Sequence, residues 1–224
     1  MNQPRVLMAW SGGKDSVLAL DALRTSGEPV LGLLTTVTET TATVSSHGVP
    51  LDLIRRQAAA LGLPLHEVAL PEAASNAAYR AAMRGALQQA RHAHGITDVA
   101  FGDLRLRDVR AWREAQVAEA GLRARFPLWG TASAELVRQI WSAGVAATVA
   151  RVDRTLVAGT LAGRAYDPEL VADLPAAADP AGEGGEFHTF VHRGPGFSWS
   201  VEARVKGYVD DERFTTAVLA APGH

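Results

Sequence analysis

Six consecutive residues near the start of the chain have the side chains and backbone needed to hold an anion. They are Ser11-Gly12-Gly13-Lys14-Asp15-Ser16. The glycines allow a ligand to approach the backbone N–H groups closely, the serines add hydroxyl donors and Lys14 adds a positive charge. Asp15 contributes a carboxylate of the kind that binds Mg²⁺. These residue types predict a phosphate-binding loop with a metal ligand beside it.

A second group of chemically active side chains lies near the other end of the chain. Residues 182–191 read Gly-Glu-Gly-Gly-Glu-Phe-His-Thr-Phe-Val, so two carboxylates, an imidazole and a hydroxyl fall close together, at Glu183, Glu186, His188 and Thr189. Carboxylates can hold an ammonium ion or take a proton from it. Two-residue alternation along a strand would place Glu186 and His188 on one side. On composition alone, a surface hairpin with solvated charges remains the alternative.

The first of these segments lies between two apolar stretches. Residues 5–10 form a run short enough for one buried strand, and residues 17–23 carry leucines at helical spacing. A strand that turns into a helix leaves free backbone N–H groups and the positive end of the helix directed at one point. The flanking sequence therefore supports an anion site at this turn.

The following residues alternate between strand and helix patterns. Strands are predicted at 30–37, 65–70, 98–104 and 123–129, and helices at 51–61, 76–94 and 108–121. Pro50 and Gly62 mark the ends of the first helix, and Ser75 or Asn76 and Gly95 those of the second. Such alternation requires a mainly parallel sheet, whose ligands bind at the carboxyl ends of the strands.

The pattern changes after Thr131. A helix at 133–143 and a strand at 146–152 are followed by Gly/Pro-rich pieces and by antiparallel strands at 187–191, 199–206 and 214–219. The predicted fold is α/β: a Rossmann-like, mainly parallel sheet with helices on both faces in residues 1–127, plus a smaller C-terminal α+β domain in residues 128–224.

Composition excludes several classes of function. Lys plus Arg (22) falls just below Asp plus Glu (24) among 224 residues, which gives no support to a nucleic-acid-binding face. No apolar run reaches the roughly 20 residues of a membrane span, and no signal-peptide pattern is present, so we expect a cytoplasmic protein. The chain has no cysteine, which excludes persulfide chemistry and cysteine-held zinc or iron–sulfur clusters.

The loop at 11–16 is neither a Walker A loop, because the first glycine is missing and Asp15 follows the lysine, nor a G-x-G-x-x-G turn. It resembles the S-G-G-x-D-S loop of the ATP pyrophosphatases, the PP-loop enzymes. That resemblance implies ATP and Mg²⁺. Ser11, Gly12, Gly13 and Ser16 would hold the pyrophosphate, Lys14 would neutralise its charge, and the strand that contains Thr35 would line the adenine pocket.

Three segments together resemble the diphthine–ammonia ligase family: Ser11–Ser16, Gly102-Asp103 and Gly182–Val191. The likeness extends over nearly the whole chain and includes residues 47–49, 60–64 and 127–130. It implies that ATP converts a carboxylate to an acyl-adenylate, with release of pyrophosphate, and that ammonia then forms an amide.

The same resemblance assigns roles to individual residues. The implied catalytic residues are Lys14, Asp15, Glu183, Glu186 and His188; the implied substrate-binding residues are His47, Asp103 and Thr189; and the implied metal ligands are Asp15 and Asp103. His188 stands where archaeal and eukaryotic relatives usually carry an acidic residue and is similar to the bacterial branch. The acceptor is therefore left open. For Asp103 a helix cap or turn, and for His47 simple solvation, remain the alternatives.

Two other functions stay open from the sequence. One is an ATP-binding PP-loop protein without turnover, a nucleotide sensor; the second polar segment argues against it. The other is an amine-transferring tRNA-modifying PP-loop enzyme, which would need a basic face. The expected partners are a small-molecule or protein carboxylate and ammonia, without nucleic acid or membrane, and a homodimer is left open.

Overall fold

The computed structural model describes residues 3–223; Met1, Asn2 and His224, at the outer ends of the two predicted domains, lie outside the described residues. Its larger sheet contains five parallel strands in the order β4-β2-β1-β5-β6. Their bounds are β1 Val6–Ala9, β2 Val30–Thr38, β4 Leu65–Leu70, β5 Asp98–Ala100 and β6 Arg123–Arg125. A short strand, β3 (Thr43–Val44), pairs antiparallel with the end of β2.

The order of the strands reverses at β1, and this reversal determines where the loop at residues 11–16 lies. The chain moves from β1 to β2 on one side and later returns to β5 on the other side of β1. In open α/β sheets ligands bind in the crevice outside the carboxyl ends of the strands at such a switch point. Residues 11–16 follow β1 directly and therefore lie in that crevice.

Helices cover both faces of the parallel sheet. On one face, α1 (Lys14–Thr25) and α2 (Leu51–Leu61) share a core with Val6, Met8 and Leu33. On the other face, α3 (Asn76–His94) and α4 (Arg107–Glu119) pack over a second core that includes Leu7 and Val99. Adjacent strand residues thus point to opposite cores, as the two-residue period of a strand requires.

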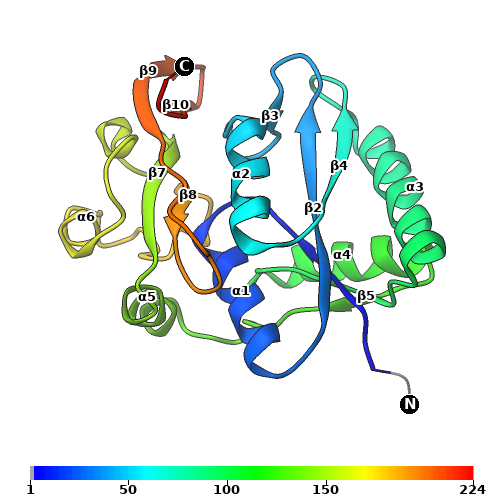
Figure 1. Ribbon diagram of the computed structural model, residues 1–224. Coiled ribbons are helices and arrows are strands. Elements are labelled where there is room, and N and C mark those ends of the chain that lie inside the picture. Colours follow the sequence, from blue (N-terminus) through cyan, green and yellow to red (C-terminus); the bar gives the residue numbers. More distant parts are fainter. Residues whose placement is uncertain (1–2, 224) are drawn as a thin grey trace.

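A second sheet is antiparallel, in the order β8-β7-β10-β9. Its bounds are β7 Ala146–Asp153, β8 Phe187–Arg193, β9 Arg204–Asp210 and β10 Phe214–Ala220, and the surrounding pieces are α5 (Ser133–Ser142), the 3₁₀ turn η1 (Gly159–Leu161) and α6 (Pro168–Ala172). Phe187 and Phe190 join the core of α1 and α2, so these two helices lie between the sheets (Figure 1). The boundary predicted at 127/128 falls in the link from β6 to α5.

The predicted fold class is confirmed, and so are the helices at 51–61 and 76–94. Three predicted strands differ. The strand at 98–104 ends at Ala100, the one at 123–129 ends at Arg125 before Pro127 in a turn, and the one at 199–206 begins at Arg204. In the last case Ser198 donates its N–H (2.8 Å) and its hydroxyl (2.6 Å) to Ala60 O, which holds this stretch against α2 instead of in the sheet.

Candidate active site

The loop after β1 is a tight, internally bonded turn. The hydroxyls of Ser11 and Ser16 lie 3.0 Å apart, and the Gly13 N–H donates to Ser11 Oγ at 3.3 Å. Gly12 has φ of +80°, a conformation that other residues adopt only with strain. Gly13 is the N-terminal cap residue of α1, so the positive end of that helix faces the turn.

Strand β8 of the second sheet holds this loop in place. The Val191 N–H donates to Gly12 O at 2.9 Å, and the Lys14 N–H donates to Thr189 Oγ1 at 3.1 Å. A Cβ at Gly13 would lie 3.2 Å from Thr189 O, so loop and strand are in close contact. The two segments singled out from the sequence are therefore neighbours in space.

A cavity of about 300 Å³ opens between these two segments. It is lined by parallel-sheet residues and by residues from the two segments, including Ala9, Ser11, Asp15, Ser16, Leu34, Thr36, His47, Tyr79, Met83, Phe101, Asp103, Arg113, Glu183 and His188. Seven of the predicted site residues thus share one cavity: Ser11, Asp15, Ser16, His47, Asp103, Glu183 and His188.

Three carboxylates line this cavity. Asp15 Oδ1 is buried without a hydrogen-bond partner, and Asp103 forms an ion pair with Arg113 at 2.7 Å. Glu183 Oε1 accepts from the backbone N–H groups of Leu104 (3.0 Å) and Arg105 (3.2 Å). Burial, helped by the nearby Asp15 and Asp103, raises the pKa of Glu183. This carboxyl is thereby a better proton acceptor than an ordinary glutamate.

Two imidazoles form another part of the wall. The rings of His47 and His188 lie 4.5 Å apart, and His47 Nδ1 is 3.2 Å from Thr189 O. Burial lowers the pKa of His47 to about 4, and burial together with the nearby His47 and Lys14 holds the pKa of His188 well below its usual value. Both imidazoles are therefore neutral at pH 7, which removes charge repulsion between them.

Lys14 lies behind the cavity, not among its lining residues. Lys14 is 2% exposed, and its ammonium is 3.0 Å from Asp15 Oδ2. The ammonium also lies 5.6 Å from the ring centre of Tyr166 and 5.5 Å from that of Phe187. A buried ammonium needs such partners, because an unpaired charge in the interior is costly. Lys14 is therefore separated from the cavity and touches the lining residue Asp15.

The glycines Gly12 and Gly13 lie outside the lining, and so do three further predicted side chains, contrary to expectation. Glu186 is buried, and its Oε1 accepts from Asp179 N–H at 2.8 Å, so it closes a turn and does not share a role with His188. Thr189 uses its hydroxyl on Lys14 N–H, which makes it a support for the loop. Thr35 is buried with an unpartnered hydroxyl, and its neighbours Leu34 and Thr36 line the cavity instead. In each case strand alternation or a tertiary contact turned the side chain away.

The donor set fits Mg²⁺ held together with phosphates. Asp15 lines the cavity with a side chain that is 32% exposed, and its Oδ1 has no hydrogen-bond partner, whereas the Asp103 carboxylate is paired with Arg113. Within residues 3–223 no group of three or more His, Asp or Glu side chains forms a metal cage. Mg²⁺ usually takes only one or two carboxylates and completes its shell with water and substrate phosphates, so Asp15 is the residue that would hold it.

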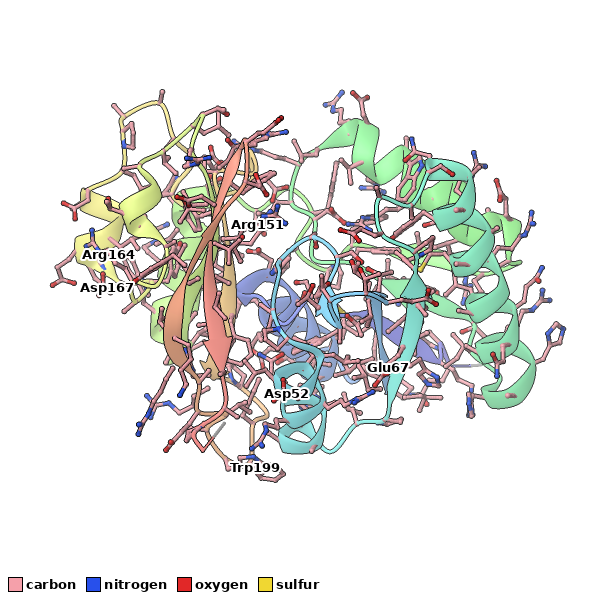
Figure 2. All side chains as sticks on the ribbon, turned by 90° about the horizontal axis from the view of Figure 1, so that it is seen from above. Asp52, Glu67, Arg151, Arg164, Asp167 and Trp199 are labelled. Carbon is pink, nitrogen blue, oxygen red and sulfur yellow. The ribbon has the colours of Figure 1, made fainter. Side chains whose placement is uncertain are left out.

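The sequence did not point to several residues that shape this site. Tyr79, Met83 and Phe101 add apolar surface to the cavity. Figure 2 shows Arg151 on the side of the antiparallel sheet that faces the rest of the molecule, whereas Arg164 and Asp167 lie on its outer side. Arg151 pairs across strands with His188. Helical periodicity marks Met83 only as core, and nothing local marks Arg151.

Comparison with known proteins identifies the family. Residues 4–124 match the family model described as the diphthamide synthase N-terminal domain, which is more than half of the chain. The chain belongs to this family. The diphthamide synthase match covers the loop at 11–16, His47 and Asp103, and it stops before β8. The resemblance inferred from the sequence is thereby confirmed. Members of this PP-loop family bind ATP, generally with Mg²⁺.

Two further comparisons add little about function. Among solved structures, the chain is similar to the crystal structure of a predicted subunit of tRNA methyltransferase from Methanocaldococcus jannaschii, with 21% identity, coverage of 62% of this chain and 75% of that chain, and a TM-score of 0.40. No curated protein matches the chain. Among the helices of residues 3–223, none is long and apolar enough to cross a membrane.

Proposed function

We propose that this member of the diphthamide synthase family is an ATP-dependent ligase that adenylates a carboxylate and forms an amide with ammonia. One observation carries the proposal. The phosphate-binding loop and the carboxylate and imidazole of the C-terminal segment, Glu183 and His188, line the same cavity. A nucleotide in the loop and an acceptor beside Glu183 would therefore share one space.

The loop side of the cavity suits a nucleotide. Ser11 and Ser16 hydroxyls and the N-terminal end of α1 would hold the pyrophosphate part of ATP. The apolar surface of Leu34, Met83 and Phe101 would take the adenine. Mg²⁺, held by Asp15 and the phosphates, would neutralise part of the phosphate charge. Lys14, paired with Asp15, adds positive potential from behind.

The chemistry then proceeds in two balanced steps. An oxygen of the acceptor carboxylate attacks the α-phosphorus, the bond from that phosphorus to the bridging oxygen breaks, and pyrophosphate leaves with the electron pair. Ammonia next attacks the carbonyl carbon of the acyl-adenylate, and AMP leaves. The loop charges stabilise the negative charge that builds up on the departing groups.

Glu183 is the residue best placed to serve the second step. Its raised pKa and its position between two backbone N–H donors favour an ordered carboxylate that binds ammonium and accepts its proton. Neutral His188 gives the acceptor a hydrogen-bonding wall without adding charge. Asp103 is paired with Arg113, so the charge that would attract a cation such as ammonium comes from Glu183.

The test is product analysis with and without ammonium. The protein is incubated with ATP, Mg²⁺ and either the small-molecule or the protein fraction of a bacterial extract, and the adenine nucleotides are separated. We expect AMP and pyrophosphate, with amide formation that depends on ammonium. ADP and orthophosphate as products, or bound ATP without turnover with either fraction, would contradict the ligase; the second result would favour a nucleotide sensor.

The chain offers a matched control for the charge in the loop. It contains two lysines, the buried Lys14 and the exposed Lys206 on β9. Lys14→Ala should lower AMP formation about a hundredfold or more, the scale of losing one preorganised charge. Lys206→Ala should leave it unchanged. Equal turnover in the two variants would contradict a role for Lys14 in the reaction.

A further inference from the structure

The peptide unit between Gly12 and Gly13 has a fixed orientation. Its carbonyl oxygen accepts two hydrogen bonds, from Val191 N–H at 2.9 Å and from Gln57 Nε2 at 3.1 Å. In a trans peptide the oxygen and the N–H point in opposite directions. The Gly13 N–H therefore faces the other way, toward the hydroxyl of Ser11, which lines the cavity.

Gln57 of α2 is the side chain that fixes this orientation. It is 0% exposed, and each end of its amide is engaged: Oε1 accepts from Trp10 Nε1 at 2.9 Å, and Nε2 donates to Gly12 O and to Val191 O, the latter at 2.6 Å. The amide thus joins the end of β1, the loop and β8. Gln57 itself is not part of the cavity lining, so it would not contact a nucleotide.

The orientation matters because the loop has to present donors to an anion. Gly12 lies at φ +80°, and a peptide flanked by two glycines meets little steric resistance to turning over. If it turned, a carbonyl oxygen would replace an N–H beside the phosphates and would repel them. We infer that Gln57 is a positioning residue that keeps this peptide turned for phosphate binding. The inference rests on the proposed function, because it takes the anion to be the triphosphate of ATP.

This role makes a selective prediction. Loss of the amide donors should weaken binding of the phosphates but not binding of the nucleoside, because adenosine does not reach the loop amides. In calorimetric titrations, Gln57→Met should raise the Kd for Mg²⁺–ATP about tenfold, the size of one lost hydrogen bond near a charge, and change the Kd for adenosine less than about twofold. Gln57→Glu keeps an acceptor for Trp10, and at this buried position, facing two carbonyl oxygens, it would be protonated and keep one donor, so its selective loss should be smaller.

A general loss of stability would look different. Leu170→Ala removes a fully buried side chain of α6 that does not line the cavity, and it serves as a control of lowered Tm. We expect it to leave the ratio of ATP to adenosine affinity unchanged. Gln57→Asn, which keeps a shorter amide, is the milder variant in case Gln57→Met does not fold, and it should still lower the affinity for ATP more than the affinity for adenosine.

The outcomes separate this inference from the proposed function. Equal ATP affinity in wild type and the Gln57 variants, or an equal loss for ATP and adenosine, would overturn the inference. Failure of wild type to bind ATP would end the proposed function. Inorganic pyrophosphate would then be the probe, and the inference would stand only if the Gln57 variants bound it more weakly than wild type and Leu170→Ala did.

Discussion

The two glycine-rich segments that meet at the cavity differ in how many of their side chains reach it. In the first, Ser11, Asp15 and Ser16 all line the cavity, and Lys14 alone among the charged or hydroxyl side chains turns away. In the second, Glu183 and His188 line it, whereas Glu186 and Thr189 point into the protein. Each segment carries four such side chains, of which three reach the cavity from the first segment and two from the second.

The backbone explains the difference. The first segment enters a helix, whose first turn directs free N–H groups and neighbouring side chains toward one point. The second enters a strand, which sends successive side chains to opposite faces. On β8 His188 therefore meets the cavity and Thr189 meets the loop, so that one strand both lines the site and holds the loop.

The largest effect is expected at Gly12. A Cβ there would clash with Ile54 Cδ1 and lie 2.7 Å from Gln57 Oε1, at φ +80°. Gly12→Ala should cost at least about 2 kcal/mol of unfolding free energy and abolish ATP binding. Gly85→Ala, in the exposed middle of α3 with nothing within 4 Å of the new Cβ, should instead stabilise by about 0.5–1 kcal/mol. Urea unfolding and ATP titration of both variants test this contrast; a harmless Gly12→Ala would contradict the tight loop.

The next effect concerns the imidazole wall. His47 has its pKa lowered to about 4 by burial, so the unfolded chain binds its proton more readily than the folded one. Its contribution to stability is therefore present above pH 6.5 and is lost as pH falls toward 4, by roughly 2–3 kcal/mol. Urea unfolding is measured at pH 7 and at pH 4.5. Between these two pH values the free energy of unfolding should fall less for His47→Asn than for wild type. The same pH dependence in both proteins would show that His47 is not buried as a neutral ring.

The smallest effect distinguishes the two glutamates of the second segment. Glu183→Gln keeps the acceptor for Leu104 and Arg105 but removes a charge from the cavity, so AMP formation should fall about tenfold with little change in stability. Glu186→Gln keeps the acceptor for Asp179 and should leave turnover within about twofold. Steady-state kinetics of both variants decide between them. Equal losses of turnover in the two variants would mean that Glu183 and Glu186 both contribute to the reaction.

Local signals explain which features could be predicted. Pro50 and Gly62 gave the bounds of α2, and Ser75, whose hydroxyl accepts from Ala78 N–H at 3.2 Å, gave the start of α3. Strand ends were predicted less well: β5 ends at Ala100 although the prediction continued to Leu104, and β6 ends at Arg125, before the turn that contains Pro127. Elements set by short-range chemistry can be predicted from the residues themselves.

The sequence predicted which residues lie near the cavity better than it predicted what each of them contacts there. The loop and Glu183 and His188 carry recognisable residue types, so their place at the cavity was expected. The burial of Lys14 was not predicted, since it depends on Tyr166 and Phe187 from the other sheet. Gln57 gave no local signal either, because its partners lie at Gly12 and Val191, the latter 134 positions away.

A crystal structure with Mg²⁺ and α,β-methylene-ATP, which keeps its α–β link intact, tests the central claim most directly. We predict that the terminal phosphates contact Ser11 and Ser16, that the metal contacts Asp15, and that the α-phosphorus faces Glu183 and His188 across the cavity. A nucleotide bound elsewhere, or bound in the loop with its α-phosphorus turned away from those two side chains, would contradict the account.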